Sequence, residues 1–307
     1  MTSIRVGTCS WADKSLSTYW YPKGVSSAEE RLRYYADHFD AVEVDSTFYR
    51  LPDEEMTSKW AERTPDGFLF HVKAFGVMTR HPVKLEQLPP DLRDAAPTDE
   101  RGRVDRPPRE FRAEVFARFL AALEPLRAAG KLGGVLLQFP SYIVFREASI
   151  DYLRWACEHL DGHEPLVEFR HRSWLDEDHR EETLGLLEEL GATHVIVDAP
   201  KTDAKNLVPT VAALTSPTAF VRFHGRNEKT WNIRGTSASE RFDYLYSEQE
   251  LASWSATLRE LAEQAKQAFA FFNNNGRSPD SSGGWIAQAP VNALMLKNLL
   301  ENAKTSG

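Results

Sequence analysis

The stretch Ala219-Phe220-Val221-Arg222-Phe223-His224-Gly225-Arg226 shows the pattern from which the fold follows. An apolar run rich in β-branched and aromatic residues, ended by polar residues and glycine, is typical of a buried strand. Seven other runs share this pattern, namely Ile4–Cys9, Ala41–Asp45, Phe68–Ala74, Gly134–Phe139, Leu166–Arg170, His194–Asp198 and Ala268–Asn273. The sequence therefore predicts eight short strands.

Helical patterns lie between these runs. Ser27 and Glu30 have capping-box spacing before one such pattern, and Leu251, Trp254 and Leu258 repeat at helical intervals in another. Five of the seven intervals between strand starts are 26 to 37 residues, which is close to one strand-helix unit. Eight units favour an α/β protein, a single-domain TIM (β/α)8 barrel over residues 1–307. A nucleotide-binding open sheet is disfavoured because no Gly-rich fingerprint follows the first strand.

Three long segments are expected after the third, seventh and eighth strands. They are an irregular insertion at about 75–108, which holds six prolines, and the polar segments 225–247 and 276–288. In a TIM barrel, segments that follow strands lie on the face where functional sites form. They are either lids over a pocket or tolerated surface insertions.

The composition is that of a folded, soluble protein. The chain has 307 residues, 42% hydrophobic and 27% charged, with a net charge of -8. No apolar run approaches the length of a membrane span, and the first residues do not resemble a signal peptide, so we expect a cytoplasmic protein without a membrane partner. The acidic balance disfavours non-specific coating of nucleic acid, although a local basic cleft is still allowed.

Charged residues lie within the strands and at their ends. In a barrel all eight strand ends converge on one mouth, and residues two apart on a strand share a face. Four such pairs are Glu43 with Asp45, His71 with Lys73, Glu168 with Arg170, and Arg222 with His224. Buried charges need partners, so we expect acid to meet base inside the barrel, for example Glu43 or Glu168 with Arg222 or Arg170. A purely structural ion-pair network is the alternative.

These residues define a candidate active site. Glu43 and Glu168 are general-base candidates, and His224 is a proton donor or relay. Asp198 is a further base candidate and His171 a further proton carrier, while Gln138 either binds a ligand or simply ends its strand. The candidate substrate-binding residues, chosen as cations for an anion and as polar or aromatic neighbours, are Trp11, Asp45, Thr47, Tyr49, Lys73, Gln138, Arg170, His171, Trp174, Asp198, Arg222, Arg226, Asn273 and Asn274.

No metal and no cofactor is expected. Carboxylates and histidines are present, but without H-x-H, H-E-x-x-H or D-x-D spacing, and the neighbouring arginines disfavour a bound cation. Cys9 and Cys157 form no C-x-x-C pair, and there is no G-x-S-x-G elbow. Thiolate zinc sites, disulfide frameworks and nucleophilic serine or cysteine catalysis are therefore disfavoured.

Aromatic residues fall just beyond several strand ends. Trp11, Tyr49, Trp174 and Trp231 have this position, so part of the tryptophan content is expected to line the mouth. Beside arginines, exposed rings of this kind are also stacking platforms for nucleic acid.

Along nearly the whole chain the ordered motifs resemble the YecE-like family, catalogued as domain of unknown function 72. They include Gly7-Thr8-Cys9-Ser10-Trp11, 42–52, Gln138-Phe139-Pro140, 168–171 and 222–226. The resemblance implies a TIM barrel and supplies no activity. The chain departs from the family pattern in three places: Asp45 replaces a usual asparagine, Phe75 a common proline, and 276–288 is longer than usual.

Together these features favour an enzyme that acts on a small polar or anionic substrate at the mouth by general acid/base chemistry, such as a metal-independent hydrolase, lyase or isomerase. The alternatives are a protein that binds nucleic acid or phosphodiesters, which is not favoured, and a non-catalytic scaffold for a protein partner.

Overall fold

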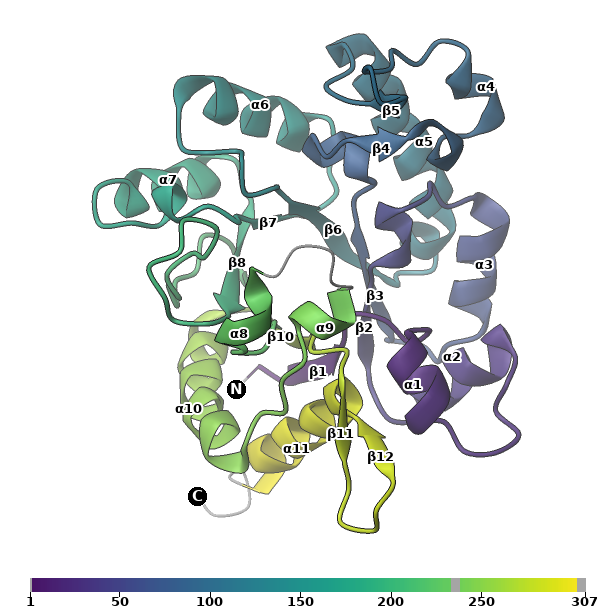
Figure 1. The fold of residues 1–307 in the computed structure, drawn as a ribbon, viewed down its shortest axis with the longest axis vertical. Coiled ribbons are helices and arrows are strands. Elements are labelled where there is room, and N and C mark those ends of the chain that lie inside the picture. The colour runs from purple at the N-terminus through teal and green to yellow at the C-terminus, as the bar shows by residue number, and fades with distance from the viewer. Residues whose placement is uncertain (1, 233–237, 303–307) are drawn as a thin grey trace.

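The computed structural model describes residues 2–232 and 238–302. Its centre is a parallel sheet of eight strands in the order β1-β10-β9-β8-β7-β6-β3-β2. The edge strands β1 and β2 pack side by side, so the sheet nearly closes into a barrel (Figure 1). The strands are β1 (Ile4–Thr8), β2 (Ala41–Val44), β3 (Leu69–Lys73), β6 (Leu132–Gln138), β7 (Pro165–Glu168), β8 (Thr193–Asp198), β9 (Thr218–Phe223) and β10 (Gln267–Phe272). All eight predicted strands are present, and the predicted TIM-barrel fold class is confirmed.

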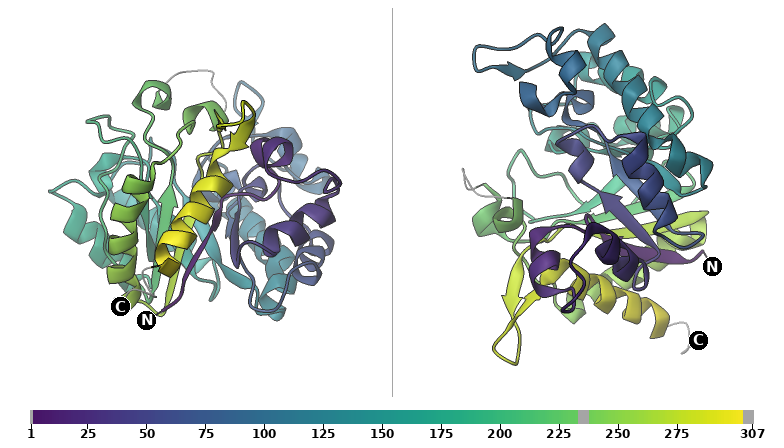
Figure 2. Two further views of the ribbon diagram at one scale, coloured as in Figure 1. Left: turned by 90° about the horizontal axis from the view of Figure 1, so that it is seen from below. Right: turned by 90° about the vertical axis from the view of Figure 1, so that its right-hand side faces the viewer.

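Helices surround the sheet, as Figure 2 shows. Several begin with sequence-encoded caps, and the predicted capping box of Ser27 and Glu30 does start α2. The main helices are α1 (Lys14–Tyr19), α2 (Ala28–Ala36), α3 (Glu54–Glu62), α5 (Arg109–Ala128), α6 (Glu147–Glu158), α7 (Arg180–Glu189), α10 (Glu248–Gln264) and α11 (Gln288–Asn302).

One connection differs from the expected alternation, because residues 199–217 between β8 and β9 contain no helix. Pro200, Pro209 and Pro217 interrupt this segment, and each lacks the backbone N–H that a helix interior needs. The segment is instead held to the sheet, for example where Thr210 Oγ1 donates to the carbonyl of Val197 at 2.9 Å.

The expected long segments contain short regular elements. Within 75–108 the chain forms the 3-10 turns η2 (Gly76–Thr79) and η3 (Leu85–Gln87), the helix α4 (Pro90–Arg93) and an antiparallel ribbon of β4 (Val83–Lys84) and β5 (Arg103–Val104). This insertion lies over α5 (Figure 1). The segment after β9 carries α8 (Glu228–Trp231) and α9 (Ala238–Arg241), although its residues 233–237 lie outside the described residues. The segment after β10 is a hairpin of β11 (Arg277–Pro279) and β12 (Trp285–Ala287).

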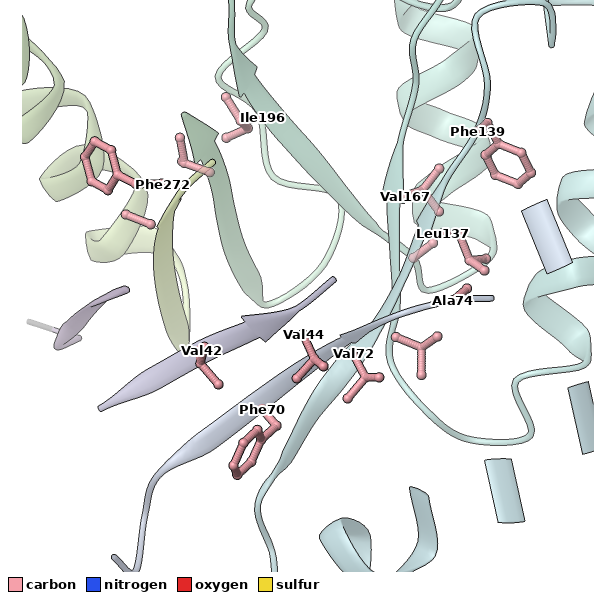
Figure 3. Packing of buried hydrophobic residues seen from close by; sticks show 14 of the residues in the cluster. Val42, Val44, Phe70, Val72, Ala74, Leu137, Phe139, Val167, Ile196 and Phe272 are labelled. Atoms are coloured by element: carbon pink, nitrogen blue, oxygen red, sulfur yellow. The ribbon is translucent and has the colours of Figure 1, made fainter. Parts of the chain in front are cut away.

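Strand alternation divides the apolar residues into two cores. The larger core joins the outer face of the sheet to the helices, and Val42, Val44, Phe70 and Val72 in Figure 3 belong to it. The smaller core fills the barrel interior with the alternate strand residues, among them Leu136, Leu166, Phe220, Phe269 and Phe271. Within the described ranges no helix is long and apolar enough to cross a membrane.

His71 is enclosed in the interior core. Its ring lies 4.3 Å from Phe269 and 5.0 Å from Phe220, measured between ring centroids, and neither ring nitrogen has a hydrogen-bond partner among the described residues. Gly133 makes room for it, since a Cβ there would stand 2.4 Å from the imidazole. Burial lowers the pKa of His71 to about 3, so the ring is neutral in the fold.

We predict that His71 makes the fold sensitive to acid. Its pKa is lower in the folded chain than in the unfolded chain, so between about pH 6.5 and 3 the unfolded state binds the extra proton and stability falls as pH falls. The loss approaches about 1.4 kcal/mol per pH unit. In urea unfolding series at pH 7, 6, 5 and 4, His71→Leu should lose stability less steeply than the wild type. Equal slopes for the two chains would contradict the prediction.

Candidate functional site

The charged layer above the interior core is centred on Arg222 of β9, which is 1% exposed. Its Nε and Nη2 atoms donate to the two carboxylate oxygens of Glu43 on β2, at 2.8 and 2.6 Å. Its Nη1 donates to Glu168 on β7. The predicted meeting of acid and base inside the barrel is confirmed, and one guanidinium bridges two strands that are far apart in the sequence.

Both carboxylates of this cluster are inaccessible to solvent. Glu43 and Glu168 are 0% exposed. Burial favours the neutral acid, but Arg170 and Arg222 outweigh it and hold the pKa of Glu168 well below its usual range. Glu168 therefore stays ionised as the counter-charge of two arginines.

Arg170 extends the cluster toward the mouth. It is ion-paired with Glu168, its Nη2 atom donates to Gln138 Oε1 at 3.3 Å, and the same Nη2 lies 3.0 Å from His224 Nε2. His224 Nε2 also lies 3.3 Å from Glu168 Oε1. Burial and the nearby Arg170 lower the pKa of His224 to about 3, and its Nδ1 lies 2.9 Å from the Asn273 amide.

A cavity of about 360 Å³ opens above this cluster, at the carboxyl ends of the strands. We call it the mouth cavity. Seven of the predicted binding residues line it: Asp45, Tyr49, Lys73, Gln138, Arg170, Arg222 and Asn273. Trp231, expected at the mouth from its position, lines it as well.

Lys73 contributes an amine to the lining of the mouth cavity. Its Nζ donates to Gln138 Oε1 at 3.0 Å and lies 4.4 Å from the ring centroid of Phe48. Burial and repulsion by Arg222 lower the pKa of Lys73 to about 8. Thr47 supports this residue from below, because its Oγ1 donates to the Lys73 carbonyl at 2.6 Å.

Asp45 is the carboxylate that lines the mouth cavity. Burial raises the pKa of Asp45 to about 7, although the charge of Lys73 opposes the shift. Two groups that titrate near neutral pH, one acidic and one basic, therefore share one cavity.

The three predicted catalytic residues lie behind the wall of this cavity. Glu43, Glu168 and His224 are all buried and do not line it. Each contacts an arginine that does line it, either Arg170 or Arg222. These three residues can therefore act on a ligand indirectly, by orienting the arginines that line the cavity.

Other predicted residues lie away from the mouth cavity. Asp198 is ion-paired with Arg226 at 2.8 Å and accepts hydrogen bonds from Tyr246 at 2.6 Å and Trp254 at 3.2 Å, which places it on the α10 side of the barrel. That network borders a separate hollow of about 180 Å³.

Four more predicted residues have structural contacts instead. Trp11 packs edge-on against Trp60, and Trp174 stacks on Phe169 with ring centroids 4.2 Å apart. His171 Nδ1 contacts the Ser173 hydroxyl at 2.8 Å, and the Asn274 amide donates to the Tyr244 carbonyl. The expectation that Trp11 and Trp174 present open rings at the mouth is not met, because both are buried.

The mouth cavity also has lining residues that the sequence reasoning did not select. They include His81 from the insertion, Phe48, Asn206, Phe242 and Arg241 of α9. His81 and Arg241 lie in the long segments expected after strands three and seven, so their place in those segments was the available signal. Burial and the charge of Lys73 lower the pKa of His81 to about 3.

The fold and site together define a TIM-barrel protein with a cation-lined cavity at the carboxyl ends of its strands. Within the described ranges no group of three or more His, Cys, Asp or Glu residues is placed to hold a metal ion. The family model "Protein of unknown function DUF72" matches residues 5–306, and the chain belongs to this family.

Relatives and solved structures agree with this assignment. The chain is 34% identical to the UPF0759 protein YunF of Bacillus subtilis, over 92% of each chain, and 27% identical to the UPF0759 protein YecE of Escherichia coli, over 83% of each. A crystal structure of a DUF72 family protein from Thermotoga maritima is similar with a TM-score of 0.74 at 32% identity, covering 97% of this chain and 99% of that one. A DUF72 family protein from Enterococcus faecalis has a TM-score of 0.76 at 26% identity, covering 97% and 96%.

We predict that the Arg222 cluster is required for stability. Removing the guanidinium in Arg222→Met leaves two buried carboxylates without a counter-charge, which should lower the free energy of unfolding by about 3–5 kcal/mol. Urea unfolding at pH 7 measures the loss. Arg154→Met is the matched control, because its exposed pair with Glu189 contributes about 1 kcal/mol at most. Similar losses for the two variants would contradict the prediction.

Proposed function

We propose that the protein is an enzyme that acts on a small polar, anionic substrate, bearing phosphate or carboxylate, in the mouth cavity. The observation that carries the proposal is the separation of charge. Lys73, Arg170, Arg222 and Arg241 line the cavity, whereas Glu43 and Glu168 are sealed beneath it. Planar guanidinium groups beside an amine suit the oxygens of a phosphate or carboxylate.

Proton transfer in this cavity is assigned to Lys73. A general acid or base works best when its pKa lies near the working pH, and burial brings the pKa of Lys73 to about 8. Glu43, Glu168 and His224 then act as positioning residues that hold Arg222 and Arg170 toward the substrate, which refines their expected catalytic role. Fixed donors of this kind stabilise charge that develops in a transition state.

The alternative functions have less support. Stacking of nucleic acid bases needs exposed aromatic rings. Of the aromatic residues expected at the mouth, Trp11 and Trp174 are buried, whereas Tyr49 is 55% exposed. A scaffold needs no cavity lined by cations from separate strands.

We predict that anion binding weakens as pH rises. Deprotonation of Lys73 above about pH 8 removes a positive charge, and deprotonation of Asp45 above about pH 7 adds a negative one. Sulfate is the probe because it stays a dianion over this range. Calorimetric titration of the wild type should show affinity falling from pH 6 to pH 9. Asp45→Asn should remove the dependence near pH 7, and an affinity independent of pH would contradict the prediction.

We further predict that Lys73→Met abolishes turnover. Sulfate affinity should fall by about tenfold, which corresponds to about 1.4 kcal/mol. In a screen of phosphate and carboxylate substrates, any activity of the wild type should be lost in Lys73→Met. It should be retained in Lys59→Met, whose amine pairs with Glu55 on the exposed side of α3. Undiminished turnover by Lys73→Met would overturn the assignment of this residue.

A further inference from the structure

The lining of the mouth cavity is not cationic throughout. After β2 the chain forms the short 3-10 turn η1 (Ser46–Phe48), and Asp45, Phe48 and Tyr49 line the cavity from this turn and its two flanking residues. A ligand in the cavity therefore meets a carboxylate and aromatic rings as well as the N–H donors of the cations.

The carboxylate of Asp45 has no partner in the fold. Aspartate at the start of a helical turn usually accepts a hydrogen bond from a backbone N–H of that turn, but Asp45 makes no such bond. In the described part of the chain no other hydrogen bond or ion pair reaches this carboxylate either. Glu43 and Glu168 differ in this respect, because both are paired with Arg222. Asp45 is thus an acceptor that the fold leaves to a ligand.

The neighbouring amine of Lys73 does not satisfy Asp45. Val44 of β2 pairs with Val72 of β3, so Asp45 and Lys73 are the next residues along two adjoining strands. They nevertheless form no ion pair, and the amine donates to Gln138 Oε1 at 3.0 Å instead. The cavity therefore keeps a cation and a carboxylate side by side without joining them.

The turn that carries Asp45 is fixed to the adjoining strand. Thr47 Oγ1 donates to the Lys73 carbonyl at 2.6 Å and lies 3.2 Å from the Val44 carbonyl. The acid and the amine are therefore held near each other before any ligand binds. An unpartnered carboxylate that is partly buried costs stability, and burial accordingly raises the pKa of Asp45 to about 7.

The charges of the cavity indicate which donor Asp45 accepts from. A ligand can offer a carboxylate either a hydroxyl or an ammonium group. Lys73 and three arginines line the same cavity and would repel an ammonium group, whereas a hydroxyl carries no charge. The two oxygens of Asp45 can accept from two neighbouring hydroxyls, and a cavity of about 360 Å³ suits a small molecule.

We propose that Asp45 determines specificity in the mouth cavity by accepting hydrogen bonds from hydroxyl groups, so that the substrate is a hydroxylated anion, such as a sugar phosphate or a hydroxy acid. This inference rests on the function proposed above, because the cations must hold the anionic group. It adds the part of the substrate that the cations do not recognise.

The test compares two ligands of the same chain length, glycerol 3-phosphate and n-propyl phosphate, which differ in two hydroxyl groups. The full chain is titrated calorimetrically at pH 7.5, between the pKa values of Asp45 and Lys73. The wild type should bind glycerol 3-phosphate about tenfold more tightly. In Asp45→Ala the two affinities should become about equal. This variant should also bind n-propyl phosphate more tightly than the wild type does, because a negative charge has been removed.

Two controls separate recognition from folding. Asp45→Asn and Asp45→Ala should both keep or raise the thermal midpoint, because the fold gives this carboxylate no partner. A carboxylate that served the fold would lower the midpoint when removed. Asp151→Ala is the matched control, since it removes an exposed carboxylate that pairs with Arg109 at the surface of α6. It should leave both dissociation constants unchanged.

The outcomes distinguish this inference from the function on which it rests. If the wild type binds both phosphates equally, or if its preference persists in Asp45→Ala, the role of Asp45 is overturned while anion binding in the cavity stands. If neither phosphate binds, and glycerate and propionate do not bind either, the proposed function fails as well.

Further titrations identify the chemistry of the ligand. A preference for glycerate over propionate that is lost in Asp45→Ala, without the corresponding preference between the phosphates, supports Asp45 as the hydroxyl acceptor and identifies a hydroxy acid. The reverse result identifies a phosphate ester. Binding of phosphoethanolamine more tightly than glycerol 3-phosphate would overturn the assignment to hydroxyl groups, because Asp45 would then recognise an ammonium group.

Discussion

The rest of the structure depends on a single buried guanidinium. Arg222 has Glu43 and Glu168 as counter-charges, and all three are closed to solvent. A charge in this position is tolerated only when its partners are in place, and two carboxylates without the arginine would be equally costly. The sheet can therefore reach its nearly closed form only when β2, β7 and β9 are in this register. The ion pairs at the top of the barrel set the strand register, and the apolar residues beneath them fill the interior.

The same cluster decides which charges a ligand can meet. Because both carboxylates turn inward to Arg222, the groups left facing the mouth cavity are mainly cations, and a chain of net charge -8 has a locally positive cavity. Arg170 is fixed by Glu168, Gln138 and His224. A donor that is already oriented loses little freedom when an anion binds, which is the physical basis of preorganised catalytic sites.

Much of this arrangement follows from the sequence because strands alternate with period two. Apolar runs that end in polar residues located the eight strands, and alternation then identified the charged residues that meet inside the barrel, Arg222 with Glu43 and Glu168. Alternation could not predict how deep in the barrel each inward-pointing side chain lies. Glu43 and Lys73 both point inward from their strands, yet only Lys73 reaches the mouth cavity. It also could not separate Trp231, which lines the cavity, from Trp174, which stacks on Phe169, since both simply follow strands. Those outcomes depend on loop packing between distant segments.

The insertion after β3 connects the mouth cavity to the helices that surround the sheet. His81 lines the mouth cavity, while Arg80, in the left-handed conformation, directs its side chain to Tyr152 between α5 and α6. One turn of the insertion therefore contributes both to the lining of the mouth cavity and to the packing of the helix layer around the sheet.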